Sequence, residues 1–191
     1  MSSATETADL VRAASQGDSR AWEELVEQFT GLLWSIARGY DLDRAAAADV
    51  VQTAWFRLVE HLGRLERPER VGAWLATTVR RESLRVVKAG RREVAADDSA
   101  FEQPAGEGFS PEAATLAQEE LRLVWAAFQD LPERCRRLLR ALMASPPPAY
   151  TEVAAAFEIP VGSIGPTRGR CLDLLRRRLS GPDGGPLRAP A

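Results

Sequence analysis

The residues with the clearest chemical potential are basic side chains that could hold a phosphate backbone. Residues 80–92 contain six basic residues and a single acid, Glu82. The basic positions recur every three or four residues, so most of them share one face of a helix. One acid cannot neutralise six bases, and such a face favours a polyanionic partner such as DNA over plain solvation. The residues that we expect to contact DNA here are Trp74, Arg80, Arg81, Arg85 and Lys88, with Trp74 as a candidate for stacking on a base.

A second group of basic residues follows a short helical pattern near the end of the chain. Residues 151–157 and 164–180 read as a short helix and a longer arginine-bearing helix separated by a tight turn, which is the layout of a helix-turn-helix. Pro166 fits if Ser163 is the N-cap, because the third helical residue has no intrahelical acceptor for its N–H group. The alternative is a plain helical hairpin with a solvated arginine face. The small core of this motif should contain Val153, Phe157, Ile159 and Ile164.

Composition argues against an enzyme or a metal protein. The chain has 191 residues, a net charge of −2, one histidine and two cysteines. A single histidine, His61, removes most zinc sites and most nucleophile–histidine pairs. Cys135 and Cys171 fall at apolar helical positions, so we interpret them as small hydrophobic residues rather than as a disulfide or a metal site. We therefore expect no catalytic residue, no metal and no cofactor.

Apolar residues recur at helical spacing throughout, and alternating strand patterns do not occur. The prediction is an all-α fold, with Asp18 and Asp43 as N-caps of the second and third helices. Trp22, Trp55 and Trp125 are expected in the core, and Val59 is expected to point inward from the third helix. The predicted helices cover about residues 8–16, 18–40, 43–62, 68–90, 111–131, 132–144, 151–157 and 164–180.

An acidic segment separates the two basic regions. Between residues 93 and 120 there are eight acids and no base, together with several Gly and Pro residues. Such a segment is either a flexible, self-repelling tether or an imitation of nucleic acid that lies in a basic channel of a partner. The predicted organisation is two small helical domains: residues 1–93, a flexible acidic linker over 94–113, a second domain over 114–180 that carries the helix-turn-helix, and a disordered tail over 181–191. No membrane span or secretory signal is expected, and a cytoplasmic location is the default.

Taken in order, these motifs resemble an extracytoplasmic-function sigma factor of bacterial RNA polymerase, a branch of the sigma-70 family. The segments that carry the resemblance are DRAAAADVVQTAWFRL (43–58), VGAWLATTVRRESLRVVKAGRR (71–92), DLPERCRRLL (130–139) and YTEVAAAFEIPVGSI (150–164). The resemblance implies a first domain that binds core polymerase and melts the minus-ten element, and a second domain that reads the minus-thirty-five element. It also implies that Asp49 and Gln52 stand at the places of the family's polymerase-binding residues, and with Phe56 and Arg57 they make up the predicted polymerase-binding face of the third helix.

The sequence departs from the family pattern at several positions. Arg81 and Arg85 stand where the family usually has Asn and Asp, and Glu158 stands at a usual turn glycine. Candidates for minus-thirty-five contacts are therefore assigned by position alone: Ser163, Gly165, Thr167, Arg168 and Arg170.

The implied partners are core polymerase through its beta and beta-prime subunits, promoter DNA and, where one exists, an anti-sigma factor. The alternative is a stand-alone helix-turn-helix regulator that binds DNA without polymerase. It would leave the polymerase-binding residues and the first basic helix unexplained.

Overall fold

The computed structural model describes residues 4–96 and 116–180, and within these residues every regular element is a helix. The all-α prediction is thereby confirmed. The first half holds α1 (Ala4–Ser15), α2 (Ser19–Arg38), α3 (Arg44–His61), the short 3-10 turns η1 (Leu62–Arg64) and η2 (Pro68–Arg70), and α4 (Val71–Ala96). The second half holds α5 (Leu116–Gln129), α6 (Glu133–Leu142), α7 (Tyr150–Phe157), η3 (Val161–Ser163) and α8 (Ile164–Leu179). None of these helices is long and apolar enough to cross a bilayer.

The two predicted N-caps are confirmed. The Asp18 carboxylate accepts the backbone N–H groups of Arg20 and Ala21 at 2.9 and 3.2 Å, and Asp43 accepts that of Ala46 at 2.7 Å. Each bond satisfies an N–H group that the helix leaves without a partner and is worth about 1 kcal/mol. The caps fix where α2 and α3 begin, and so which of their residues face the core.

The core of the first half lies where α2, α3 and α4 meet. Phe29, Leu33, Leu58, Leu75 and Val79 are almost fully buried there. Two sequence expectations fail: Val59 on α3, predicted to point inward, is 57% exposed, and Trp125 on α5, predicted to lie in a core, is 56% exposed. Helical spacing placed both on an apolar face, yet the described neighbouring helices leave more than half of each side chain exposed.

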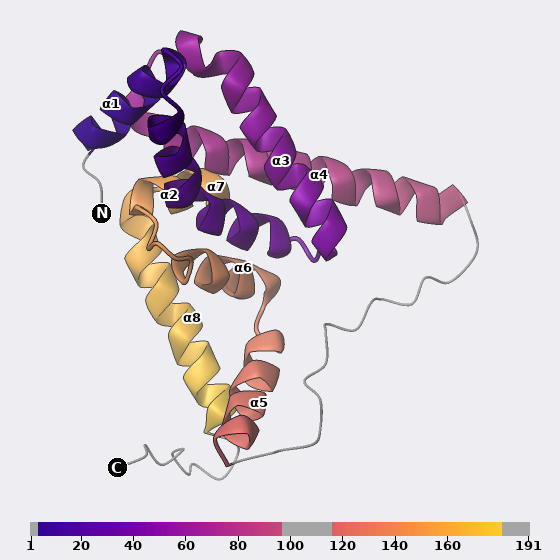
Figure 1. Cartoon of the computed structure of the whole chain (residues 1–191). Helices are drawn as coiled ribbons and strands as arrows, with labels where there is room; N and C mark the ends of the chain where they lie inside the picture. The colour runs from indigo at the N-terminus through magenta and orange to yellow at the C-terminus, as the bar shows by residue number, and fades with distance from the viewer. Residues whose placement is uncertain (1–3, 97–115, 181–191) are drawn as a thin grey trace.

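The second half packs directly against the first. Ala141, Ala144 and Ala156, from the region of α6 and α7, belong to the same buried cluster as Phe29 and Leu33. In Figure 1, α6 and α7 lie against α2 and α4, and α8 runs away from this contact toward α5. Most of the predicted linker, and the predicted tail, lie outside the described residues; α4 itself continues to Ala96.

Two glycines allow this close packing. A Cβ atom added to Gly31 on α2 would overlap the backbone carbonyl oxygen of Ser145, and one added to Gly72 on α4 would overlap the carboxylate of Glu152 on α7. Because glycine has no side chain, α2 and α4 approach the second half more closely at these two positions than they could with any other residue there.

The two cysteines form a disulfide, so the interpretation of them as separate apolar residues is wrong. Cys135 on α6 and Cys171 on α8 are 36 positions apart, and their Cα atoms lie 5.4 Å apart. The bond lies in a small apolar cluster with Phe128, Leu131 and Leu139. Sequence spacing could not reveal this pairing, because it depends on how α6 crosses α8.

The turn between α7 and α8 has its own small core. Leu138, Val153, Ala154 and Ile164 are buried together, and Phe157 and Ile159 pack against them. Val153, Phe157, Ile159 and Ile164 are the four residues that the sequence predicted for this core. Ser163 occupies the N-cap position of α8, and Pro166 is the third residue of that helix. The Ser163 side chain makes no capping hydrogen bond.

Candidate functional site

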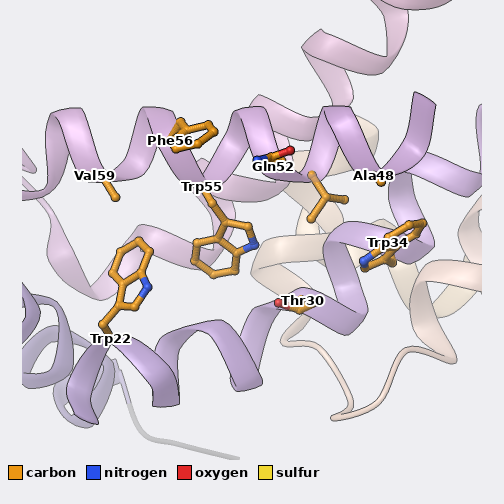
Figure 2. Close-up of a pocket in the computed structure, with 9 residues that line it drawn as sticks. Trp22, Thr30, Trp34, Ala48, Gln52, Trp55, Phe56 and Val59 are labelled. Carbon is orange, nitrogen blue, oxygen red and sulfur yellow. The ribbon is translucent and has the colours of Figure 1, made fainter. Parts of the chain in front are cut away.

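The first candidate surface is the side of α3 that faces away from the core. Asp49, Gln52 and Phe56 are exposed on it, at the spacing of successive helical turns. Phe56 and Gln52 border an open apolar groove of about 430 Å³ between α2 and α3 (Figure 2). The residues that line the groove are Trp22, Thr30 and Trp34 on α2 and Ala48, Val51, Gln52, Trp55, Phe56 and Val59 on α3.

The groove explains why Val59 is not buried. Val59 lines the groove together with Trp55, whose ring meets that of Trp22 edge-on with centroids 5.6 Å apart. Trp22 and Trp55 are half-buried and pack against the main core, so they form the floor of the groove rather than the centre of the protein. An exposed row of apolar side chains beside polar ones is typical of a protein-binding surface.

Arg57 differs from the other predicted residues on α3. Its guanidinium lies 2.8 Å from a carboxylate oxygen of Glu82 on α4. The same carboxylate faces Arg85 at 3.6 Å through its other oxygen. Sequence reasoning did not assign Glu82 a role, although its place as the single acid in a basic helix was a usable signal.

The basic residues of α4 form the second candidate surface. Arg81, Arg85 and Lys88 are exposed, whereas Arg80 is held by Glu158 of the second half, with 2.6 Å between nitrogen and oxygen. Glu158 follows α7 with a φ of 52°, a left-handed conformation that glycine usually supplies. Three basic residues of the predicted DNA-binding face are thus exposed, although Arg85 also faces Glu82, while Arg80 is less exposed and is paired with Glu158.

Trp74 is half-buried near the start of α4. Its ring lies 5.9 Å from that of His61, at the end of α3, and its backbone carbonyl accepts the Thr78 hydroxyl at 2.9 Å. Trp74 packs against the main core, so only part of the ring remains available for stacking.

The third candidate surface is the beginning of α8. Gly165, Arg168 and Arg170 are exposed there, while Ser163 and Thr167 are partly buried. Arg170 lies 3.4 Å from the Thr167 hydroxyl, and no acid among the described residues is paired with Arg168 or Arg170. The structure therefore places the five predicted positions at the N-cap and in the first two turns of α8, where three of them are exposed.

Partly buried charged side chains line the contact between the halves. Arg137 donates to the Gly39 carbonyl at 2.8 Å and lies over the Tyr40 ring, and Arg140 donates to the Arg38 carbonyl at 3.0 Å. Burial lowers the pKa of the Arg140 guanidinium. Burial also raises the pKa of Glu152, opposed by the hydrogen bond that its carboxylate accepts from the Ala149 N–H group.

Comparison with known proteins identifies a family domain in the first half of the chain. Residues 25–93 match the family model described as sigma-70 region 2. That range runs from within α2 to within α4, so it contains the exposed side of α3 and the basic side of α4. No curated protein sequence matches the chain.

Two solved structures share the fold of this chain. One is the sigma factor RpoE in complex with the anti-sigma factor NepR from Bartonella quintana, with a TM-score of 0.60 and 20% identity over 84% of this chain and 98% of that chain. Another is CnrH in complex with the cytosolic domain of CnrY, with a TM-score of 0.58 and 21% identity over 94% and 99%. With the region 2 match, these findings confirm the resemblance to extracytoplasmic-function sigma factors of the sigma-70 family.

Proposed function

We propose that this protein binds core RNA polymerase and directs promoter-specific initiation, including the melting of promoter DNA. The observation that carries the proposal is that the region 2 match contains an exposed docking surface on α3 and an exposed basic surface on α4. A protein that only bound duplex DNA would have no use for the apolar groove beside Gln52 and Phe56. The function proposed is binding and strand separation, without a catalytic residue.

In this proposal the three surfaces divide the work. Asp49, Gln52, Phe56 and Arg57 contact the beta and beta-prime subunits, and Trp74, Arg80, Arg81, Arg85 and Lys88 contact the minus-ten element. The turn between α7 and α8 acts as a helix-turn-helix at the minus-thirty-five element. Its exposed arginines at the start of α8, with no acid paired to them among the described residues, support that role.

Two further parts of the proposal concern the partner and the place of action. RpoE and CnrH were both solved in complexes with a second protein, which supports an anti-sigma partner for this chain as well. Polymerase and promoter DNA place its work in the cytoplasm.

The test is a comparison of DNA binding and transcription with and without core polymerase. The purified chain, bacterial core polymerase and a library of genomic fragments from the source organism are combined, and transcript 5′ ends are mapped. We expect specific start sites only when both proteins are present, and no specific duplex binding by the chain alone. Specific binding by the chain alone, without an effect on polymerase, would support the stand-alone regulator instead.

A further inference from the structure

Glu82 occupies an unusual position, because it is a buried acid on an otherwise basic helix. Its side chain is only 11% exposed, and it lies on the buried side of α4 beside Val79 and Ser83. One carboxylate oxygen lies 2.8 Å from Arg57 and the other 3.6 Å from Arg85. The single carboxylate therefore joins a residue of the proposed polymerase surface to a residue of the proposed DNA surface.

The two arginines are held unequally. The Arg57 side chain is 41% exposed and makes the shorter contact, whereas the Arg85 side chain is 77% exposed and makes the longer one. A buried carboxylate must keep a charged or hydrogen-bonding partner. Arg57 meets that requirement by itself, so Arg85 can leave Glu82 for a phosphate without leaving an unpaired buried charge.

We propose that Glu82 is a positioning residue that couples DNA binding to polymerase binding; this inference rests on the proposed function. When Arg85 moves to a DNA phosphate, the whole charge of Glu82 is left to Arg57 and fixes Arg57 more firmly in the position from which, in the proposed function, it contacts polymerase. Bound DNA then strengthens binding to polymerase. Because coupling between two ligands is reciprocal, bound polymerase strengthens binding to DNA by the same factor.

The experiment measures the affinity of the full-length chain for core polymerase with and without a single-stranded oligonucleotide. The oligonucleotide carries the non-template minus-ten sequence of a promoter mapped in the transcription test. For the natural chain we expect DNA to tighten core binding about fivefold or more. In Glu82→Gln, which keeps the shape of the side chain and removes its charge, that gain should disappear. The matched control is Glu60→Gln, an exposed acid on α3, which should keep the gain.

The outcomes separate this inference from the proposed function. Failure of the natural chain to bind core polymerase overturns the proposed function. Normal binding with the same DNA-dependent gain in Glu82→Gln overturns the coupling role, and so does a uniform loss of affinity that leaves the gain intact, since that describes a merely structural residue. Should circular dichroism show that Glu82→Gln is unfolded, Glu82→Asp replaces it. The shorter acid keeps the charge but cannot reach both arginines, so an undiminished gain in that variant also overturns the proposal.

Discussion

Single exposed residues on α3 should govern affinity for polymerase without affecting stability. Asp49 and Gln52 are exposed and lie one turn apart, beside the groove. Replacing both with alanine should weaken binding to core polymerase about tenfold or more, because residues at the centre of an interface carry most of its binding energy. Thermal unfolding should be unchanged. The control is Glu66→Ala, an exposed acid outside the helix, and equal affinities of the two variants would rule out this docking surface.

The exposed arginines of α4 and α8 should produce different defects. Changing Arg85 and Lys88 to Glu should impair strand opening, measured by permanganate reactivity of thymines. Changing Arg168 and Arg170 to Glu should impair recruitment to duplex DNA, measured by holoenzyme binding to a promoter fragment. Each lost phosphate contact should also lower the slope of log affinity against log salt by about 0.9 on duplex DNA. The same defect from both pairs in both assays would contradict a division of labour.

The structural role of a residue could be predicted from the sequence when that role involved only neighbouring positions of the chain. Asp18 and Asp43 were identified correctly as caps because a cap involves only the next three residues. Arg80 was named correctly as a basic residue of the helix, but its pairing with Glu158 spans 78 positions and has no local signature. Val59 was placed inside because helical periodicity marks apolar residues without showing which side a neighbouring helix covers.

At the scale of elements, the disulfide should hold α8 to α6. Closing a loop of 36 positions stabilises the folded state by about 4 kcal/mol in the chain-entropy account. Reduction, or changing Cys135 and Cys171 to Ser, should therefore lower the unfolding temperature of the second half. The measurement is thermal unfolding by circular dichroism with and without a thiol reductant. The Ser variant serves as the control, since the reductant should have no further effect on it, and equal curves for the natural chain would contradict the bond.

The carboxyl group of Glu152 should make the contact between α7 and α4 sensitive to pH. Burial raises its pKa above the ordinary value of 4.5, so the folded state holds the proton more tightly than the unfolded state. The contribution of Glu152 to the free energy of unfolding is therefore fully present below the ordinary pKa and is lost as pH rises through the raised pKa. Glu152→Gln should remove this component. Its stability relative to the natural chain should rise with pH, as measured by urea unfolding at several pH values, and a constant difference would contradict the prediction.

The arrangement of the whole molecule was the least predictable part of the fold. The sequence predicted each of the eight α-helices that the structure describes, yet nothing in it indicated that Ala144 and Ala156 would share a core with Phe29. Small apolar residues carry almost no periodic signal of their own. The contact depends on the absence of a side chain at Gly31 and Gly72. This requirement can be recognised only when the atoms that face the two glycines are known.

The closed arrangement of the two halves should therefore depend on Gly31. Within a helix, Gly→Ala normally stabilises a protein by about 1 kcal/mol, because alanine loses less conformational freedom on folding. At Gly31 the new methyl group would overlap the Ser145 backbone carbonyl, which cannot rotate away as a flexible side chain could. We expect Gly31→Ala to separate the halves, free Arg80 from Glu158, raise the radius of gyration in small-angle X-ray scattering and increase non-specific affinity for DNA. Gly63→Ala is the matched control, because no atom outside its chain neighbours lies within 4 Å of the added Cβ. A Gly31→Ala chain that is as compact as the control and more stable than the natural chain would show that the halves do not meet in solution as they do here.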